Sequence, residues 1–97
     1  MSCELVFAPA VAVEITEAAA WYESQREGLG RELLDAIEQA LERIRRQPGA
    51  GAPWHEYRKG LVRRFPYLIV YRATSEDEVE VVAVAHMSRR PGYWIDR

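Results

Sequence analysis

The pattern of apolar and polar positions predicts a helical first half and a β-rich second half. Glu4–Phe7 is a short apolar run that stops at Ala8-Pro9, which favours a strand followed by a helix with proline in its first turn. From residue 9 to about residue 25 the apolar positions recur at helical spacing, namely Val11, Ile15, Ala18 and Tyr22. Gly28 ends this pattern.

A second helical stripe follows and is the clearest periodicity in the chain. Its apolar positions are Leu29, Leu33, Ile37, Ala40, Leu41 and Ile44, and it ends before Pro48. Charged side chains fill most of the other positions, and we expect them on a solvated helix surface. Because only a short turn with a glycine separates the two helices, they should pack as an antiparallel hairpin.

A loop-like stretch, Gln47–Pro53, separates the helices from a strand-rich region. Leu61–Ala73 and Glu78–His86 are rich in Val, Ile, Tyr and Phe, and the polar residues between them predict a β-hairpin. A shorter strand is expected before this hairpin, around His55–Arg58 or Leu61–Arg64.

Alternation assigns the side chains of the hairpin to two faces. In the first strand one face carries Phe65, Tyr67, Ile69 and Tyr71, and the other Leu68, Val70 and Arg72. In the second strand one face carries Val79, Val81, Ala83 and Ala85, and the other Glu80, Val82, Val84 and His86. One face should pack on the helices, and the other is partly exposed or covered by the C-terminal segment or a partner. We therefore predict one α+β domain, residues 1–97, of β-α-α-β-β-β order, with an antiparallel sheet packed on an α-helical hairpin.

Composition narrows the class of protein. No apolar run approaches the roughly 20 residues of a membrane-spanning helix, and no basic stretch with an apolar run opens the chain, so we expect a cytoplasmic protein. Cys3 has no partner for a disulfide, and the two histidines, His55 and His86, do not form a cluster at zinc-ligand spacing. We therefore expect no metal site and no cofactor.

Charge is distributed unevenly along the chain. Residues 1–50 hold nine acids and five bases, a net charge of −4, whereas residues 51–97 hold six acids and eight bases, a net charge of +2. Of the 13 basic residues, all but Lys59 are arginine. Arginine suits planar contacts with carboxylate or phosphate, although a genomic bias would give the same count.

The last residues combine basic and aromatic side chains. His86, Arg89, Arg90, Tyr93 and Trp94 lie within nine positions of one another. Because adjacent like charges repel, we predict an exposed patch that binds a macromolecule, formed by Arg89, Arg90, Tyr93 and Trp94. Two structural alternatives stay open: Trp94 as a lid over the second sheet face, and His86 as a histidine bonded to the backbone.

The chain resembles the RelE/ParE superfamily of toxins from bacterial type II toxin–antitoxin pairs. The resemblance covers nearly the whole chain and rests on "WYESQREGLGRELLDAIEQAL", "RRFPYLIVYRA" and "VVAVAHMSRRPGYW" in this order. It implies a cognate antitoxin that forms a hetero-oligomer with the toxin, and no membrane partner. Trp21 and Tyr22 on the first helix and the second sheet face are the expected antitoxin contacts.

The superfamily has two branches with different targets. RelE-like members cleave ribosome-bound mRNA without a metal, and here His86 would serve as base or acid. Tyr93 would donate a proton or stack on a base, and the developing charge would be stabilised by Arg64, Arg72, Arg89 and Arg90. The sequence departs from that pattern in three ways: it has one lysine, its net charge is negative, and His86 and Tyr93 are seven positions apart instead of adjacent. ParE-like members inhibit DNA gyrase by binding, and this branch is the better match. A non-toxic protein-binding module is a third hypothesis.

Overall fold

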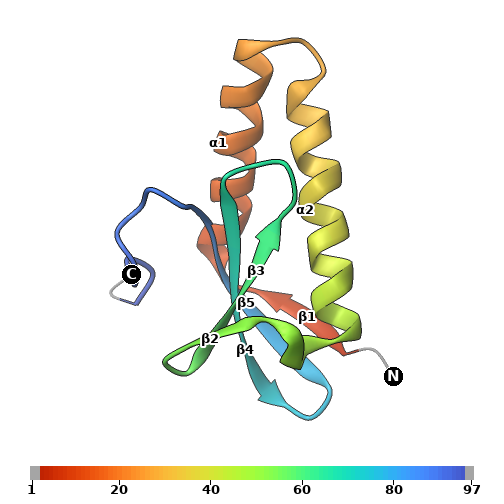
Figure 1. The fold of residues 1–97 in the computed structure, drawn as a ribbon, viewed down its shortest axis with the longest axis vertical. Helices are drawn as coiled ribbons and strands as arrows, with labels where there is room; N and C mark the ends of the chain where they lie inside the picture. The colour runs from red at the N-terminus through yellow and green to blue at the C-terminus, as the bar shows by residue number, and fades with distance from the viewer. Residues whose placement is uncertain (1–2, 96–97) are drawn as a thin grey trace.

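Both predicted helices are present, with ends close to those expected. The structure is a computed structural model that describes residues 3–95, so the first two and last two residues of the predicted domain lie outside it. Helix α1 spans Pro9–Gln25 and helix α2 spans Leu29–Arg46. The buried positions of α2 follow the predicted apolar stripe and are Gly30, Leu33, Ile37, Ala40 and Ile44. Figure 1 shows the two helices side by side, with the turn between them extending beyond the sheet.

A carboxylate of α1 holds the turn between the helices. Gly28 precedes α2 with a φ of 89°, a conformation that only glycine adopts without strain, and it has no side chain to cap the helix. The Glu23 carboxylate accepts hydrogen bonds from the backbone N–H groups of Gly28 and Gly30, each at 3.0 Å. A Cβ atom on Gly30 would lie 2.7 Å from the carbonyl oxygen of Ala19, so glycine permits the close approach of the two helices.

The second half forms most of a five-stranded sheet of order β1-β5-β4-β3-β2. The strands are β1 Glu4–Phe7, β2 Ala52–Trp54, β3 Tyr57–Val62, β4 Tyr67–Ser75 and β5 Glu78–His86. Neighbouring strands are antiparallel except β1, which pairs in parallel with β5. The element order and the packing of a sheet on a helical hairpin confirm the predicted α+β fold.

The predicted strand Leu61–Ala73 is in fact the end of one strand, a tight turn and most of another. β3 ends at Val62 and β4 begins at Tyr67. Between them Arg64 has a positive φ of 74°, and the N–H of Tyr67 donates to the carbonyl oxygen of Phe65 at 2.8 Å. Pro66 lacks an N–H group and could not contribute a donor to a continuous ladder. Phe65 therefore lies in the turn and not on β4.

A β-bulge also corrects the predicted alternation on β5. Val70 lies opposite Ala83 and Tyr71 lies opposite Val81, so Val82 is an extra residue on β5. Before the bulge, Val81 packs in the core beneath the helices. After it, Val84 packs in this core as well, while Ala83 joins Val82 on the opposite face. Strict alternation cannot anticipate an inserted residue.

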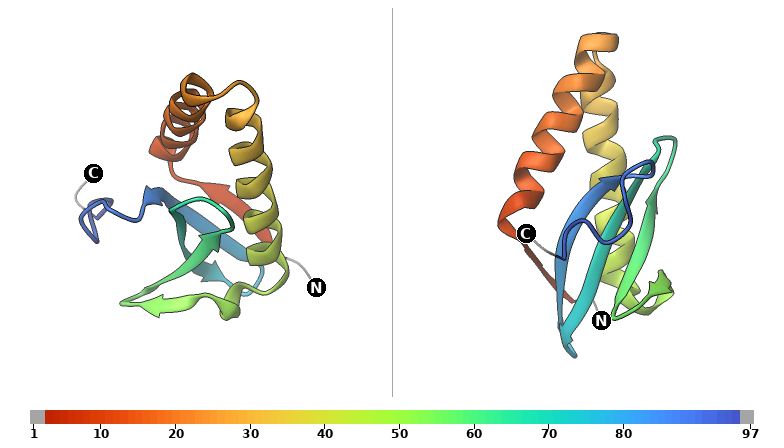
Figure 2. Two further views of the ribbon diagram at one scale, coloured as in Figure 1. Left: turned by 45° about the horizontal axis from the view of Figure 1, so that its top comes forward. Right: turned by 90° about the vertical axis from the view of Figure 1, so that its left-hand side faces the viewer.

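The sheet has an apolar cluster on each face. The larger one joins the helices to the sheet through side chains that include Leu33, Ile37, Ile69 and Val81. The smaller one, on the other face, contains Val70, Val82, Ala83 and Trp94, with Trp54, Tyr57 and Tyr93 packed against it. The C-terminal chain leaves β5 and curls back on itself away from α2, as Figures 1 and 2 show. The second face is thus covered in part by the chain's own end.

Candidate interaction surface

The C-terminal segment, residues 87–95, is folded against the second face of the sheet. A turn at Gly92, with a φ of 82°, reverses its direction, and the N–H of Ile95 donates to the Gly92 carbonyl oxygen at 3.0 Å. This turn places Trp94 on the smaller apolar cluster, where only 7% of the residue is exposed. The structure therefore supports the lid interpretation of Trp94. Its ring is not part of the exposed patch that the sequence predicts.

The remaining members of the predicted patch do lie at the surface. Arg89 and Arg90 are exposed, and Tyr93 is half-buried. The Arg89 guanidinium lies over the Tyr93 ring, 3.8 Å from its centroid, and the Tyr93 hydroxyl donates to the Glu14 carboxylate of α1. These contacts fix the aromatic ring and leave Arg90 beside it. The result is a small cationic surface anchored to the helical layer.

His86 makes the contacts of a structural histidine. Its Nδ1 accepts a hydrogen bond from the backbone N–H of Ser88 at 3.0 Å and lies 2.8 Å from the Ser88 hydroxyl oxygen. In the neutral ring the proton therefore sits on Nε2. The edge of the ring packs on Tyr67 of β4, with centroids 5.2 Å apart. His86 is thus held by local contacts at the end of β5.

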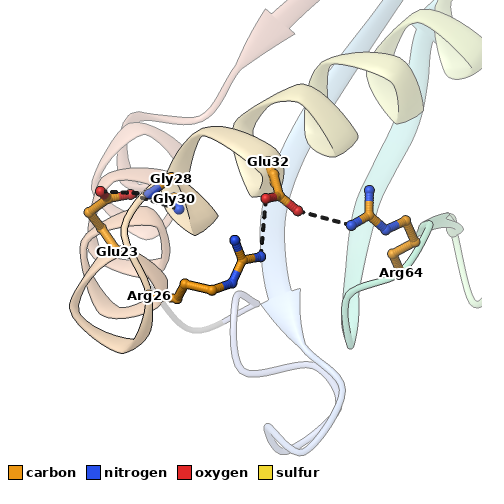
Figure 3. A network of polar contacts seen from close by, with 6 residues as sticks. All are labelled: Glu23, Arg26, Gly28, Gly30, Glu32 and Arg64. Atoms are coloured by element: carbon orange, nitrogen blue, oxygen red, sulfur yellow. Dashed lines mark hydrogen bonds and ion pairs between the residues drawn. The ribbon is translucent and has the colours of Figure 1, made fainter.

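Arg64 belongs to a polar network at the far end of the helices (Figure 3). Its guanidinium lies 2.9 Å from the Glu32 carboxylate of α2, and Arg26 lies 3.1 Å from the other oxygen of that carboxylate. Hydrogen bonds from Arg26 and then Arg64 lower the pKa of Glu32. The network joins the turn between the helices to the turn between β3 and β4. The charge of Arg64 is therefore already shared with a carboxylate.

Arg72 is likewise paired, and it lies far from His86. Its guanidinium contacts Glu80 of β5 and Glu56, each at 3.1 Å, and lies 5.9 Å from the Tyr57 ring centroid on the second face. Glu80 and His86 are six positions apart on β5, which corresponds to roughly 20 Å along the strand. His86, in contrast, contacts Tyr67, which packs against the helical core. Of the four predicted ribonuclease residues, His86 and Tyr93 line one small pocket together with Arg89 and Arg90. Arg64 and Arg72 are not part of it.

The two predicted antitoxin contacts differ in exposure. Trp21 is 59% exposed on α1. Tyr22 points into the molecule, where its ring packs edge-on against Phe65 and Tyr67 at centroid distances of 5.2 and 6.2 Å. Trp21 stacks edge-on against Tyr22 at 4.9 Å. Only Trp21 is therefore placed to contact a partner without rearrangement of the core.

Sequence reasoning missed a groove between α2 and β3, which we name the α2–β3 groove. It has a volume of about 520 Å³, and its lining includes the basic residues Arg43, Arg46, Lys59 and Arg63. These residues come from the end of α2, from β3 and from the turn after β3, so no local motif contains them. The Lys59 ammonium group itself lies over the Trp54 ring, on the other face of the sheet. The adjacent arginines at 63 and 64 were a possible signal in the sequence. Among the described residues, Arg64 forms an ion pair with Glu32 and Arg63 forms none.

Neither a metal-binding cluster nor a membrane-spanning helix is found among residues 3–95. Within residues 3–95, no three His, Cys, Asp or Glu side chains gather as a metal ion would require. None of the helices in the same range has both the length and the apolar composition to cross a membrane.

Comparisons with known proteins agree with the fold. The model of a family described as "ParE toxin of type II toxin-antitoxin system, parDE" matches residues 5–91. A solved structure described as "Chromosomal ParDE TA system from P. aeruginosa" superposes with a TM-score of 0.68 at 16% identity, covering 90% of this chain and 98% of that one. At this identity the structural likeness establishes the fold alone. No curated protein matches the chain by sequence.

Proposed function

This chain belongs to the ParE toxin family of type II toxin–antitoxin systems, and we propose that it inhibits growth by binding DNA gyrase, with no reaction of its own. A toxin of such a pair has an antitoxin as its partner, and we propose that the two form a hetero-oligomer in the cytoplasm, where gyrase works. The proposed contact surface consists of Arg89, Arg90 and Tyr93.

One observation carries the preference for binding over RNA cleavage. Two arginines that a metal-free ribonuclease would use are paired with carboxylates away from His86: Arg64 with Glu32, and Arg72 with Glu56 and Glu80. Cleavage by an adjacent 2′-hydroxyl requires a base, an acid and free cations around one phosphate. Arg89 and Arg90, in contrast, are exposed next to an aromatic ring, a combination that suits a protein or nucleic-acid contact.

A supercoiling assay with purified gyrase tests the target. We expect the wild-type protein to inhibit supercoiling, and Arg89→Ala combined with Arg90→Ala to raise the half-inhibitory concentration at least about tenfold. The double variant should keep its antitoxin affinity to within about tenfold. The matched control removes two arginines from α2 by Arg31→Ala and Arg45→Ala and should inhibit like the wild type.

The same preparation separates the alternative functions. Primer extension on translated message should detect no cleavage. Cleavage that is abolished by His86→Ala or Tyr93→Phe would replace gyrase binding with a RelE-type ribonuclease. If the protein neither inhibits supercoiling nor cleaves message, and does not inhibit growth, a non-toxic protein-binding module would be favoured.

A further inference from the structure

Glu14 is a carboxylate on the side of α1 that faces the sheet. It lies three positions after Val11 and four before Ala18, which are the buried residues of this helix. A carboxylate in such a place is unfavourable unless polar groups satisfy it. Two donors from distant parts of the chain do so, namely the backbone N–H of Val84, at 3.0 Å, and the hydroxyl of Tyr93. Glu14 therefore connects α1 to both β5 and the C-terminal segment.

The contact with β5 explains only one of the two carboxylate oxygens. Within residues 3–95, β1 pairs with β5 only as far as Phe7 opposite Val81, so the rest of this edge of β5 has no neighbouring strand. Glu14 Oε1 accepts the Val84 N–H in place of a strand partner. That role would be complete without Tyr93, whose hydroxyl donates to the other oxygen, Oε2. The second contact therefore calls for a separate explanation.

Tyr93 in turn holds Arg89. The Arg89 guanidinium lies over the Tyr93 ring, 3.8 Å from its centroid. Arg89 is exposed and, within residues 3–95, forms no ion pair with a carboxylate. The position of the guanidinium therefore depends on the position of the ring. Because the Tyr93 hydroxyl donates to an anion, the ring is also richer in electrons, which strengthens its attraction for a cation.

We infer that Glu14 is a positioning residue of the proposed contact surface, because through Tyr93 it holds the Arg89 guanidinium in place. A long arginine side chain loses rotamer freedom when it binds a partner, and an arginine that is already held loses less. Glu14 thus raises the affinity for the target without touching it. The inference rests on the proposed function only in naming gyrase as the target.

NMR of the Arg89 side chain tests the inference without any target. An aromatic ring displaces the chemical shift of a guanidinium N–H group above it, so the Nε–Hε signal of Arg89 reports whether the Tyr93 ring stays in place. Tyr93→Phe keeps the ring and removes only the hydroxyl. We expect Glu14→Ala and Tyr93→Phe to shift this signal alike, and the double variant to shift it no further. An unchanged signal in Glu14→Ala would overturn the inference and leave Glu14 as a cap on the edge of β5.

Two further variants separate positioning from a general loss of stability. Glu14→Gln keeps a hydrogen-bonding side chain of the same length, so its Arg89 signal should lie closer to that of the wild type than the signal of Glu14→Ala does. Gly51→Ala introduces a close contact with the Tyr71 hydroxyl in the loop after α2 and should leave the Arg89 signal unshifted. If Gly51→Ala shifts the signal as much as Glu14→Ala does, the signal reports stability and the inference is wrong.

Gyrase inhibition tests whether the position of Arg89 matters for the target. We expect Glu14→Ala to raise the half-inhibitory concentration for supercoiling at least about threefold, and Glu14→Gln to raise it by less than about twofold. Glu17→Ala, which removes an exposed carboxylate from the same helix, should inhibit like the wild type. If Glu14→Ala shifts the Arg89 signal but inhibits like the wild type, the inference is wrong. If the wild-type chain does not inhibit gyrase, the proposed function fails, while the Arg89 signal still decides whether Glu14 holds the arginine.

Discussion

The Tyr71 hydroxyl holds the loop that follows α2 and connects the helical half of the chain to the sheet. The side chain is buried, and its hydroxyl donates to the carbonyl oxygen of Pro48 at 2.8 Å and accepts from the N–H of Gly51 at 3.2 Å. Burial raises the pKa of this hydroxyl. The loop after α2 is thus tied to the centre of the sheet, and Gly51 lies so close to Tyr71 that no side chain fits.

Gly51→Ala should therefore destabilise the protein. The added Cβ atom would lie 2.3 Å from the Tyr71 hydroxyl oxygen and 3.0 Å from the Lys59 carbonyl oxygen. Displacing these groups should lower the free energy of unfolding by about 1–3 kcal/mol, measured by urea denaturation. Gly49→Ala in the same loop is the control, because a Cβ atom there meets no atom within 4 Å. Equal stability of the two variants would show that the loop relaxes freely.

Glu14 provides a second residue-scale prediction. Its carboxylate accepts hydrogen bonds from the backbone N–H of Val84, at 3.0 Å, and from the Tyr93 hydroxyl, so it joins α1, β5 and the C-terminal segment. A double-mutant cycle of Glu14→Ala and Tyr93→Phe should give a coupling free energy of about 0.5–3 kcal/mol. Glu14→Ala alone should also speed amide exchange at Val84, which Tyr93→Phe should not.

The control for this cycle is Glu17→Ala, which removes an exposed carboxylate from the same helix. It should show no coupling to Tyr93→Phe. A coupling as large as that of Glu14 would mean that the cycle measures the charge of α1 and not the direct contact.

At the scale of elements, the ion pairs of Glu32 predict that the stability of the fold depends on pH. Arg26 and Arg64 lower its pKa in the folded chain below the ordinary value of 4.5. The stabilisation that these ion pairs give the fold is therefore complete above the pKa that Glu32 has in the unfolded chain. It is lost as the pH falls through the lower pKa that Glu32 has in the folded chain. The urea midpoint of the wild type should fall more steeply between about pH 6 and about pH 3 than that of Glu32→Gln.

Salt and a neighbouring carboxylate provide the checks on this prediction. Because the network is exposed, about 1 M salt should bring the two pH profiles closer together. Glu38→Gln, on an exposed position of the same helix, should keep the wild-type slope. If both variants lose the same slope, the pH dependence comes from the overall charge of α2.

The elements also show which features of the fold can be predicted from the sequence alone. Both helices and the β4–β5 hairpin are local patterns, since apolar spacing and the polar turn at residues 74–77 define them, and they were predicted. The turn at Arg64, the bulge at Val82 and the parallel partner of β1 depend on how distant segments meet, and no local pattern carries them. The same holds for the candidate surface residues. Arg89 and Arg90 are neighbours in the sequence and were predicted from it, whereas Arg43 and Arg63 come close to each other only after folding.

At the scale of the whole molecule, the protection of backbone amides from hydrogen exchange should decrease from the centre of the sheet outward. Val70 on β4 and Val81 and Ala83 on β5 are fully buried between the two apolar clusters. β2 lies at one edge of the sheet and is short. Native-state hydrogen exchange should therefore find the slowest amides in β4 and β5 and much faster ones in β2 and the C-terminal segment. Amides in the C-terminal segment that exchange as slowly as those of Val70 would show that the segment belongs to the core.

The parallel pairing of β1 with β5 has a consequence for the timing of synthesis. The ribosome makes β1 before both helices and the other strands, yet the strand beside it, Glu78–His86, is made after all of them. Until then β4 pairs only with β3, whose other neighbour is the short β2, and so small a sheet has little stability in water. We therefore expect chains that are still being synthesised to be non-toxic, so that the antitoxin needs to bind only fully synthesised molecules.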